Sequence, residues 1–214
     1  MSRTGGPATT PAGAGAGSLR MSADERRQQL VDIGLELLES RPTHELTLEE
    51  VASTAGVSRT LVFHYFPSKA EFFSAVVATA GRRLVDASPA VPEADVETRL
   101  RAMVSAFLRF VARKRGTYLA LVRGAPGVGP AVMSELERAR AALVGLWLEA
   151  AEWPHSDDVT QLAVRGWLGA LEEVALVAAE GTSVPTPEVV EVLVRSLLAN
   201  LEIAEQLSLV APDA

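Results

Sequence analysis

Apolar and polar positions in the first part of the chain follow the spacing of short helices. Ser22 and Glu25, three residues apart, form a capping-box pattern of the kind that begins a helix. The apolar residues that follow recur every three or four positions: Leu30, Ile33, Leu37 and Leu38. This periodicity predicts a first helix that ends near Ser40, ahead of Pro42.

Three further short helices are predicted directly after it. Thr47, three residues before a glutamate, repeats the capping-box pattern, and Gly56 is expected to end that second helix in a left-handed conformation. Ser58 is placed to cap a third helix, and Ser68 to begin a longer fourth one. Four apolar residues are expected on the buried side of the fourth helix: Phe72, Phe73, Val76 and Val77.

Beyond Pro92 the pattern changes to longer amphipathic stretches separated by helix breakers. Pro130 and Pro187 stand at first helical positions, where proline is tolerated. Alternation typical of strands does not occur, so the chain is predicted to be all-α with about nine helices. The expected later helices cover residues 93–115, 118–123, 130–152, 156–180 and 186 onward.

Composition limits the chemistry. The 214 residues make one large domain or two small ones, and with 48% apolar but only 5% aromatic residues the core must be built from Leu, Val and Ala. The chain has no cysteine, which excludes disulfides, thiolate metal sites and a cysteine nucleophile and agrees with a reducing cytoplasm. His44, His64 and His155 stand too far apart to form a local ligand pair, so no metal site is predicted.

Charge is distributed unevenly. Residues 1–83 carry nine basic and nine acidic side chains, whereas residues 84–214 carry eleven and eighteen, so the net charge of −7 lies entirely in the second part. This asymmetry indicates two segments with different roles. Because the sequence contains neither a run long enough for a transmembrane helix nor a secretory signal pattern, a soluble cytoplasmic protein without membrane contact is expected.

Residues 1–20 are rich in Gly, Pro, Ala, Thr and Ser, and they are predicted to form a disordered arm. A functional alternative is an arm that enters a DNA minor groove through Arg3 or Arg20.

Residues 48–65 fit the helix-turn-helix template. Small Ala52 stands where two helices cross, and Gly56 stands in the turn. Apolar residues occupy the packing positions: Val51, Ala55, Val57 and Val62. In such a motif the second helix projects toward a DNA major groove. An ordinary helical hairpin is the alternative for this pattern taken alone.

The string VSRTLVFHYFPSK at residues 57–69, preceded by TLEEVA at residues 47–52, resembles the N-terminal DNA-binding domain of the TetR family of transcriptional regulators. In that family an aromatic-rich recognition helix is followed by Phe-x-x-Lys, here Phe66 to Lys69. The resemblance covers about residues 22–80. It implies a helix-turn-helix domain at residues 21–67, joined by a fourth helix to a helical ligand-sensing and dimerisation domain at residues 68–214.

Chemistry favours DNA contacts at the starts of these helices. Thr47 and Ser58 lie at helix N-termini, where the hydroxyl, the backbone amides and the helix dipole attract a phosphate oxygen. Arg59 and Thr60 occupy the first turn of the predicted recognition helix, from which side chains reach base edges, and arginine can bond guanine O6 and N7 together. We therefore expect the first pair to position the protein and the second pair to read sequence.

The family resemblance adds three phosphate contacts, at His64, Tyr65 and Lys69. Many family members have Tyr where Phe63 stands and His where Tyr65 stands. The hydroxyl that a tyrosine would offer to a phosphate at position 63 is therefore missing here. Core packing is the alternative role for Phe63 and Tyr65, and it is the role expected for Phe66.

The last two predicted helices carry apolar stripes, and the family resemblance implies that they pair two copies of the chain in a four-helix bundle. The alternative is that these stripes close the core of the monomer. The stripes comprise Leu162, Val164, Trp167, Leu168, Leu171 and Val174 on one helix and residues 190–204 on the other.

Six large side chains fall on helices that surround a ligand cavity in the family, and core packing is the alternative for each: Met103, Phe107, Phe110, Tyr118, Trp147 and Trp167. They suggest an unidentified small-molecule effector that is apolar or aromatic. The basic residues between Arg99 and Arg123 are interpreted as a solvated face, with one arginine directed toward an acidic ligand as the alternative.

Catalytic patterns are missing: the sequence shows no nucleophile paired with a base, metal-ligand set or phosphate-binding loop, and Asp157-Asp158 and Glu172-Glu173 are interpreted as solvated surface. An enzyme is not expected, nor is a cofactor. The sequence predicts a ligand-responsive transcriptional regulator, a repressor that binds a pseudopalindromic operator as a homodimer and is released by a small molecule. A helical interaction protein that has lost DNA binding is the alternative.

Overall fold

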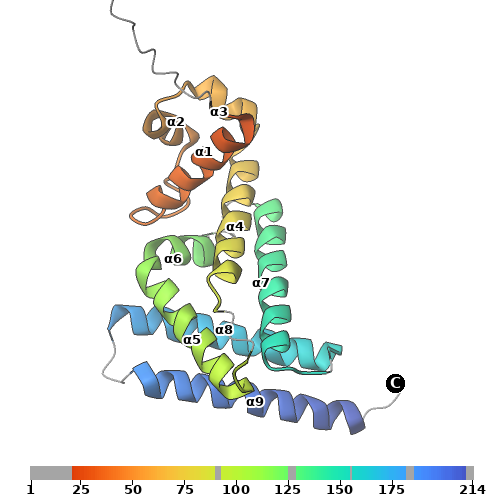
Figure 1. Cartoon of the computed structure of the whole chain (residues 1–214). Coiled ribbons are helices and arrows are strands. Elements are labelled where there is room, and N and C mark those ends of the chain that lie inside the picture. Colours follow the sequence, from red (N-terminus) through yellow and green to blue (C-terminus); the bar gives the residue numbers. More distant parts are fainter. Residues whose placement is uncertain (1–20, 90–92, 125–128, 155, 182–185, 211–214) are drawn as a thin grey trace, which may run out of the picture.

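The computed structural model describes residues 21–89, 93–124, 129–154, 156–181 and 186–210 (Figure 1). Within these ranges the chain forms nine helices and no strand, as the all-α prediction required. The predicted arm at residues 1–20 and His155 lie outside the described residues. The helices are α1 (Ala23–Leu37), α2 (Leu48–Ala55), α3 (Arg59–Tyr65), α4 (Lys69–Asp86), α5 (Val96–Arg113), α6 (Arg115–Gly124), α7 (Pro130–Ala150), α8 (Asp158–Glu180) and α9 (Thr186–Val210).

Local capping signals set the first helix boundaries. The Ser22 hydroxyl accepts a 3.2 Å hydrogen bond from the Glu25 amide, and the Glu25 carboxylate accepts one of 2.7 Å from the Ser22 amide. Thr47 closes the same reciprocal capping box at the start of α2. Gly56 ends α2 with φ of 65°, a left-handed conformation in which glycine meets no steric penalty. These predictions are confirmed.

The helix predicted at residues 118–123 begins earlier than expected. Lys114 interrupts the helical conformation with φ of −124°, yet its amide still bonds to the Phe110 carbonyl at 3.0 Å, so α6 follows α5 directly from Arg115. The sequence carries no proline or capping side chain at this junction, which explains why the boundary was missed.

Two apolar clusters share α4. The first joins α1–α3 to the first half of α4 and contains Phe66, Phe72 and Phe73, whose rings meet edge to edge with centroids 5.2 and 5.6 Å apart. Leu84, in the last turns of α4, belongs to the second cluster, built mainly from α5, α7, α8 and α9. In Figure 1, α4 runs beside α7 from the α1–α3 group toward α8 and α9, which lie side by side at the bottom of the view.

Helices α8 and α9 each have two apolar faces. Most residues of the predicted stripes close the core of the monomer; Leu171 and Leu197, for example, are fully buried. Leu162 of the α8 stripe is an exception, with 71% of its surface exposed. The outer faces carry a second set of exposed apolar side chains: Val159, Leu162 and Val177 on α8, and Val192, Ile203 and Leu207 on α9.

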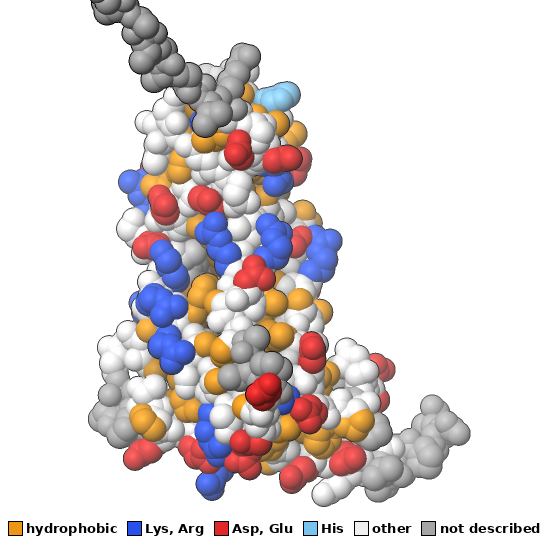
Figure 2. All heavy atoms as spheres, in the orientation of Figure 1, with side chains coloured by type: hydrophobic (Ala, Val, Ile, Leu, Met, Phe, Trp, Pro, Cys, Tyr) orange, Lys and Arg blue, Asp and Glu red, His pale blue; other side chains and the backbone are white. Residues whose placement is uncertain are grey.

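The described helices include none long and apolar enough to cross a membrane. Lysine and arginine side chains gather over the middle of the face drawn in Figure 2, and acidic side chains gather at its lower end, where α8 and α9 lie.

Candidate DNA-binding surface and ligand cavity

The recognition helix α3 is anchored by one side and exposed on the other. Val62 is fully buried, and Phe63 and Tyr65 are half-buried against the N-terminal cluster. The exposed side begins at Ser58, whose hydroxyl accepts a 3.2 Å hydrogen bond from the Leu61 amide. The predicted contact residues Arg59, Thr60 and His64 are all exposed.

Arg59 lies against neighbouring side chains of its own domain. Its Nε atom is 2.8 Å from Oε1 of Glu49 on α2, and its guanidinium lies over the Phe63 ring, 5.1 Å from the centroid. Both partners of the ion pair are at least half exposed, so water and salt weaken it. The guanidinium is therefore held at the α2–α3 surface by contacts weak enough to be exchanged for a base edge.

The flanking residues are engaged in local bonds. The Thr47 hydroxyl accepts from the Glu50 amide at 3.2 Å and donates to the Glu50 carboxylate at 3.1 Å. Lys69 donates a 3.2 Å hydrogen bond to the His44 carbonyl, and its ammonium lies 5.6 Å from the Phe73 ring centroid. The structure thus places most of the predicted residues at the exposed side of α3 and at the starts of α2 and α4, whereas Tyr65 is half-buried against the N-terminal cluster.

Comparison with known proteins identifies the family. The model of the tetR family of bacterial regulatory proteins matches residues 30–76, and that of the tetracyclin repressor-like C-terminal domain matches residues 96–200. A solved tetR-family transcriptional regulator from Streptomyces coelicolor has a TM-score of 0.72 and 30% identity, covering 86% of this chain and 83% of that one. The chain belongs to the TetR family.

This TetR-family chain is accordingly a DNA-binding transcriptional regulator. It is 35% identical over 103 residues to the HTH-type transcriptional activator FasR of Mycolicibacterium smegmatis, and 35% identical over 83 residues to the regulator BetI of Escherichia coli. These alignments cover 47% of this chain and of FasR, and 37% of this chain and 43% of BetI, so less than half of each curated relative is matched. The fatty acid degradation regulator FadR of Bacillus halodurans shares the fold, with a TM-score of 0.63 at 20% identity over 81% of this chain and 94% of that one.

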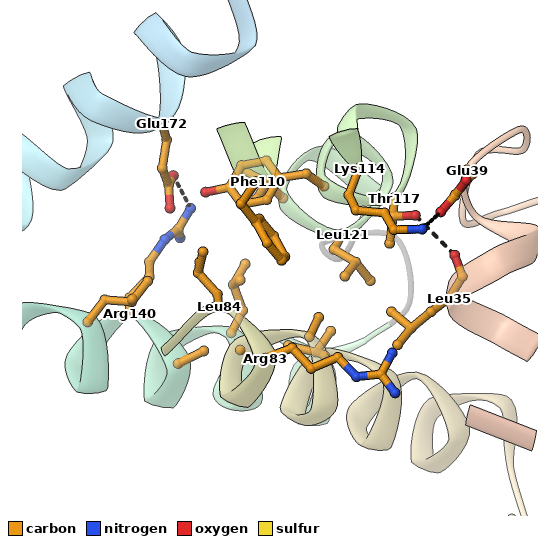
Figure 3. Close-up of a pocket in the computed structure, with 18 of the residues that line it drawn as sticks. Leu35, Glu39, Arg83, Leu84, Phe110, Lys114, Thr117, Leu121, Arg140 and Glu172 are labelled. Carbon is orange, nitrogen blue, oxygen red and sulfur yellow. Dashed lines mark hydrogen bonds and ion pairs between the residues drawn. The ribbon is translucent and has the colours of Figure 1, made fainter. Parts of the chain in front are cut away.

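A cavity of about 250 Å³ lies between the DNA-binding helices and the C-terminal helices (Figure 3). Its wall includes Leu35 and Glu36 of α1 and Glu39 in the turn after it, residues that were expected only in the DNA-binding unit. Apolar side chains form the middle of the wall: Leu84 of α4, Phe110 of α5, Leu121 of α6, and Leu136 and Leu143 of α7.

The six predicted ligand residues are divided between different environments. Phe110 and Tyr118 line the large cavity. Met103, Phe107 and Trp147 line a second cavity of about 10 Å³, which also touches Phe110. Trp167 lines neither; it is buried, and its indole nitrogen donates to the Leu193 carbonyl at 3.0 Å and to the Ser196 hydroxyl at 3.1 Å.

A buried ion pair closes one end of the large cavity. Nη2 of Arg140 on α7 lies 3.2 Å from Oε2 of Glu172 on α8, whose residue surface is only 7% exposed. Tyr118 stands beside this pair; burial, followed by the negative charge of Glu172, raises the pKa of its hydroxyl well above the usual range. The interpretation of Glu172 as solvated surface was wrong, although its position four residues after buried Leu168 is the helical signal that could have corrected it.

Polar contacts also join the cavity wall to α1 and to the turn that follows it. Thr117 of α6 donates a 3.0 Å hydrogen bond to the Leu35 carbonyl, and Lys114 forms an ion pair with Glu39. Both contacts are drawn in Figure 3, at the end opposite Glu172. Groups of three or more potential metal ligands do not occur among the residues that the structure describes.

Proposed function

We propose that this regulator is a ligand-responsive repressor that binds a pseudopalindromic operator as a homodimer and leaves it when a small molecule enters the large cavity. The observation that carries the proposal is the cavity wall, which combines Leu35 and Glu39 of the DNA-binding unit with residues of α4–α8. A molecule in this space touches both units, which correspond to residues 21–67 and 68–214.

DNA reading is assigned to the exposed side of α3. Arg59 and Thr60 contact base edges in the major groove, whereas His64, Tyr65 and Lys69 contact phosphates together with the hydroxyls of the two cap residues, Thr47 and Ser58. Because residues 1–83 carry equal numbers of acidic and basic side chains, one copy gains little from general attraction to DNA. Two copies on a two-fold symmetric site supply the missing affinity.

Dimerisation is assigned to the outer faces of α8 and α9. Exposed apolar side chains recur there at helical spacing, including Leu162 and Val177 on α8 and Ile203 and Leu207 on α9. Gly166 and Gly169 leave open space on α8, where a partner helix can approach closely. Two such pairs pack as a four-helix bundle across a two-fold axis.

Ligand release follows from unequal affinity. A molecule shifts the equilibrium between DNA-bound and released conformations only if it binds one of them better. The proposed lever is the cavity wall itself: α4 links both apolar clusters, and α1 forms part of the cavity. Expansion of the cavity moves these helices and changes the distance between the two copies of α3 in the dimer.

The test combines mass and binding. Light scattering on the whole chain should give twice the monomer mass of 22.7 kDa. Titration of DNA from upstream of the chain's own gene should show binding that weakens as salt rises. A monomer at micromolar concentration, or equal affinity for every DNA sequence, contradicts the proposal.

A further inference from the structure

Every cation that lines the large cavity already faces a carboxylate. The lining contains three such pairs, one with α8, one with α1 and one with the turn after α1: Arg140 with Glu172, Arg83 with Asp32, and Lys114 with Glu39. Glu36 adds one more carboxylate to the wall. The cavity therefore holds no excess of positive charge to receive an anion.

At the Glu172 end of the cavity, an unpaired charge would be screened least by water. The Arg140 side chain is 24% exposed and that of Glu172 only 10%, so water screens this pair weakly. Arg140 also lies 3.4 Å from Glu137, which is itself paired with Arg165. These two arginines and two glutamates sum to zero charge, and Tyr118 beside them adds none while its hydroxyl is protonated.

A charged ligand head group would upset this balance. An anion near Arg140 would compete with Glu172 and leave one buried carboxylate without a partner, and a cation near Glu172 would displace the guanidinium in the same way. A hydroxyl or carbonyl group adds no charge. It accepts from the guanidinium or the tyrosine hydroxyl, and a hydroxyl also donates to the carboxylate.

We infer that the effector is an uncharged, largely apolar molecule with one hydrogen-bonding group, and that this group binds at Arg140 and Glu172 while the apolar body lies against Phe110, Leu121 and Leu143. This inference rests on the proposed function, because it takes the cavity to be the effector site. It excludes carboxylates and amines of the same length as preferred ligands.

Three probes with one chain length test the inference directly: 1-octanol, octanoate and octylamine, titrated calorimetrically into the full chain near pH 7 below their aggregation concentrations. Octanol should bind, and the two charged probes should bind at least roughly tenfold more weakly, because each places an unpaired charge in a partly buried site. Octanoate or octylamine binding as tightly as octanol overturns the inference, and so does the failure of octanol to bind.

Single variants should reverse the preference in opposite directions. Glu172→Gln leaves Arg140 without its buried partner, so octanoate should become the tightest probe. Arg140→Gln leaves the carboxylate in excess, so octylamine should gain instead. Circular dichroism checks the helical fold of each variant. If only one of the two variants folds, it still tests the inference, because each variant has its own expected change in probe preference. An unchanged order of the three probes in a folded variant contradicts the inference.

Arg138→Gln is the matched control. It removes one arginine charge from the same helix, but Arg138 is 68% exposed, pairs with Glu135 and does not line the cavity. The order of the three probes should stay as in the parent chain.

The affinity of the parent chain for operator DNA, measured without any probe, tests the proposed function separately from the inference about the effector. If the chain shows no sequence-specific DNA binding in this measurement, the proposed function is contradicted. If octanoate binds more tightly than octanol and weakens operator binding, the proposed function stands and the inference of an uncharged effector is wrong.

Discussion

The hydroxyl of Thr117 on α6 donates a 3.0 Å hydrogen bond to the backbone carbonyl of Leu35 on α1. The two residues are 82 positions apart, both are buried, and both line the large cavity. The same junction holds a second such bond, in which the Thr43 hydroxyl donates to the Ala120 carbonyl at 2.6 Å. The start of α6 is thereby fixed to the DNA-binding unit beside the proposed effector.

Thr117→Val should destabilise the fold by about 1–2 kcal/mol, because it keeps the side-chain shape while leaving the buried Leu35 carbonyl without this donor. Urea denaturation measures the change. Thr54→Val, at an exposed position on α2, is the matched control and should change stability by less than about 0.5 kcal/mol. Equal stability of the two variants would show that the bond contributes nothing to the junction.

Gly116→Ala should be more damaging. A β-carbon at this position would lie 2.0 Å from the Glu39 carbonyl oxygen, so α6 and the turn after α1 must separate to accept it. The expected loss is about 2 kcal/mol or more in urea denaturation. Gly145→Ala provides the contrast, because a β-carbon there meets open space in the exposed middle of α7 and should stabilise the helix by about 0.5–1 kcal/mol. A neutral effect at position 116 would contradict the close approach.

The same substitution should act differently on the two faces of the C-terminal helices. Leu162→Glu places a charge on the exposed outer face of α8, so the chain should stay folded, become monomeric and lose operator affinity. Leu197→Glu places the charge at a fully buried position of α9 and should prevent folding. Light scattering and circular dichroism distinguish the two outcomes. A dimeric Leu162→Glu protein would exclude this face as the interface.

Tyr118 should make stability depend on alkaline pH. Its folded pKa is raised above the ordinary value near 10, so above about pH 10 the unfolded chain releases this proton while the folded chain retains it. Folding stability should therefore fall as the pH rises beyond that value. Tyr118→Phe should reduce the fall, as measured by urea denaturation between neutral and alkaline pH. If the parent and the variant lose the same folding stability at alkaline pH, the tyrosine hydroxyl is exposed to water in the folded chain.

Local signals explain what the sequence analysis predicted well. The caps at Ser22 and Thr47 and the left-handed turn at Gly56 depend on residues a few positions apart, and all three form as expected. Exposure of Arg59 likewise follows from its place in the first turn of α3.

The cavity depends on contacts that no local pattern records. Arg140 and Glu172 lie 32 residues apart on different helices, and the contribution of Leu35 and Glu39 arises only because α6 packs against α1. The family resemblance and the size of the side chain placed Trp167 in the effector site, whereas its indole nitrogen is hydrogen-bonded to the Leu193 carbonyl of α9. Most residues of the α8 and α9 stripes, which were expected to pair two copies of the chain, are likewise buried in the core of the monomer, since periodicity locates a stripe but not the surface that covers it.

DNA recognition by α3 is the central claim, and one titration tests it most directly: binding to operator and mutated half-sites across a range of salt, for Arg59→Ala and Lys69→Ala. Arg59→Ala should cost about 1–3 kcal/mol on the operator and flatten the preference at one base position in each half-site. Lys69→Ala should weaken binding to all sequences alike and lower the salt dependence by about one counterion per subunit. The account is contradicted if Arg59→Ala loses the same affinity on every sequence while Lys69→Ala changes the base preference.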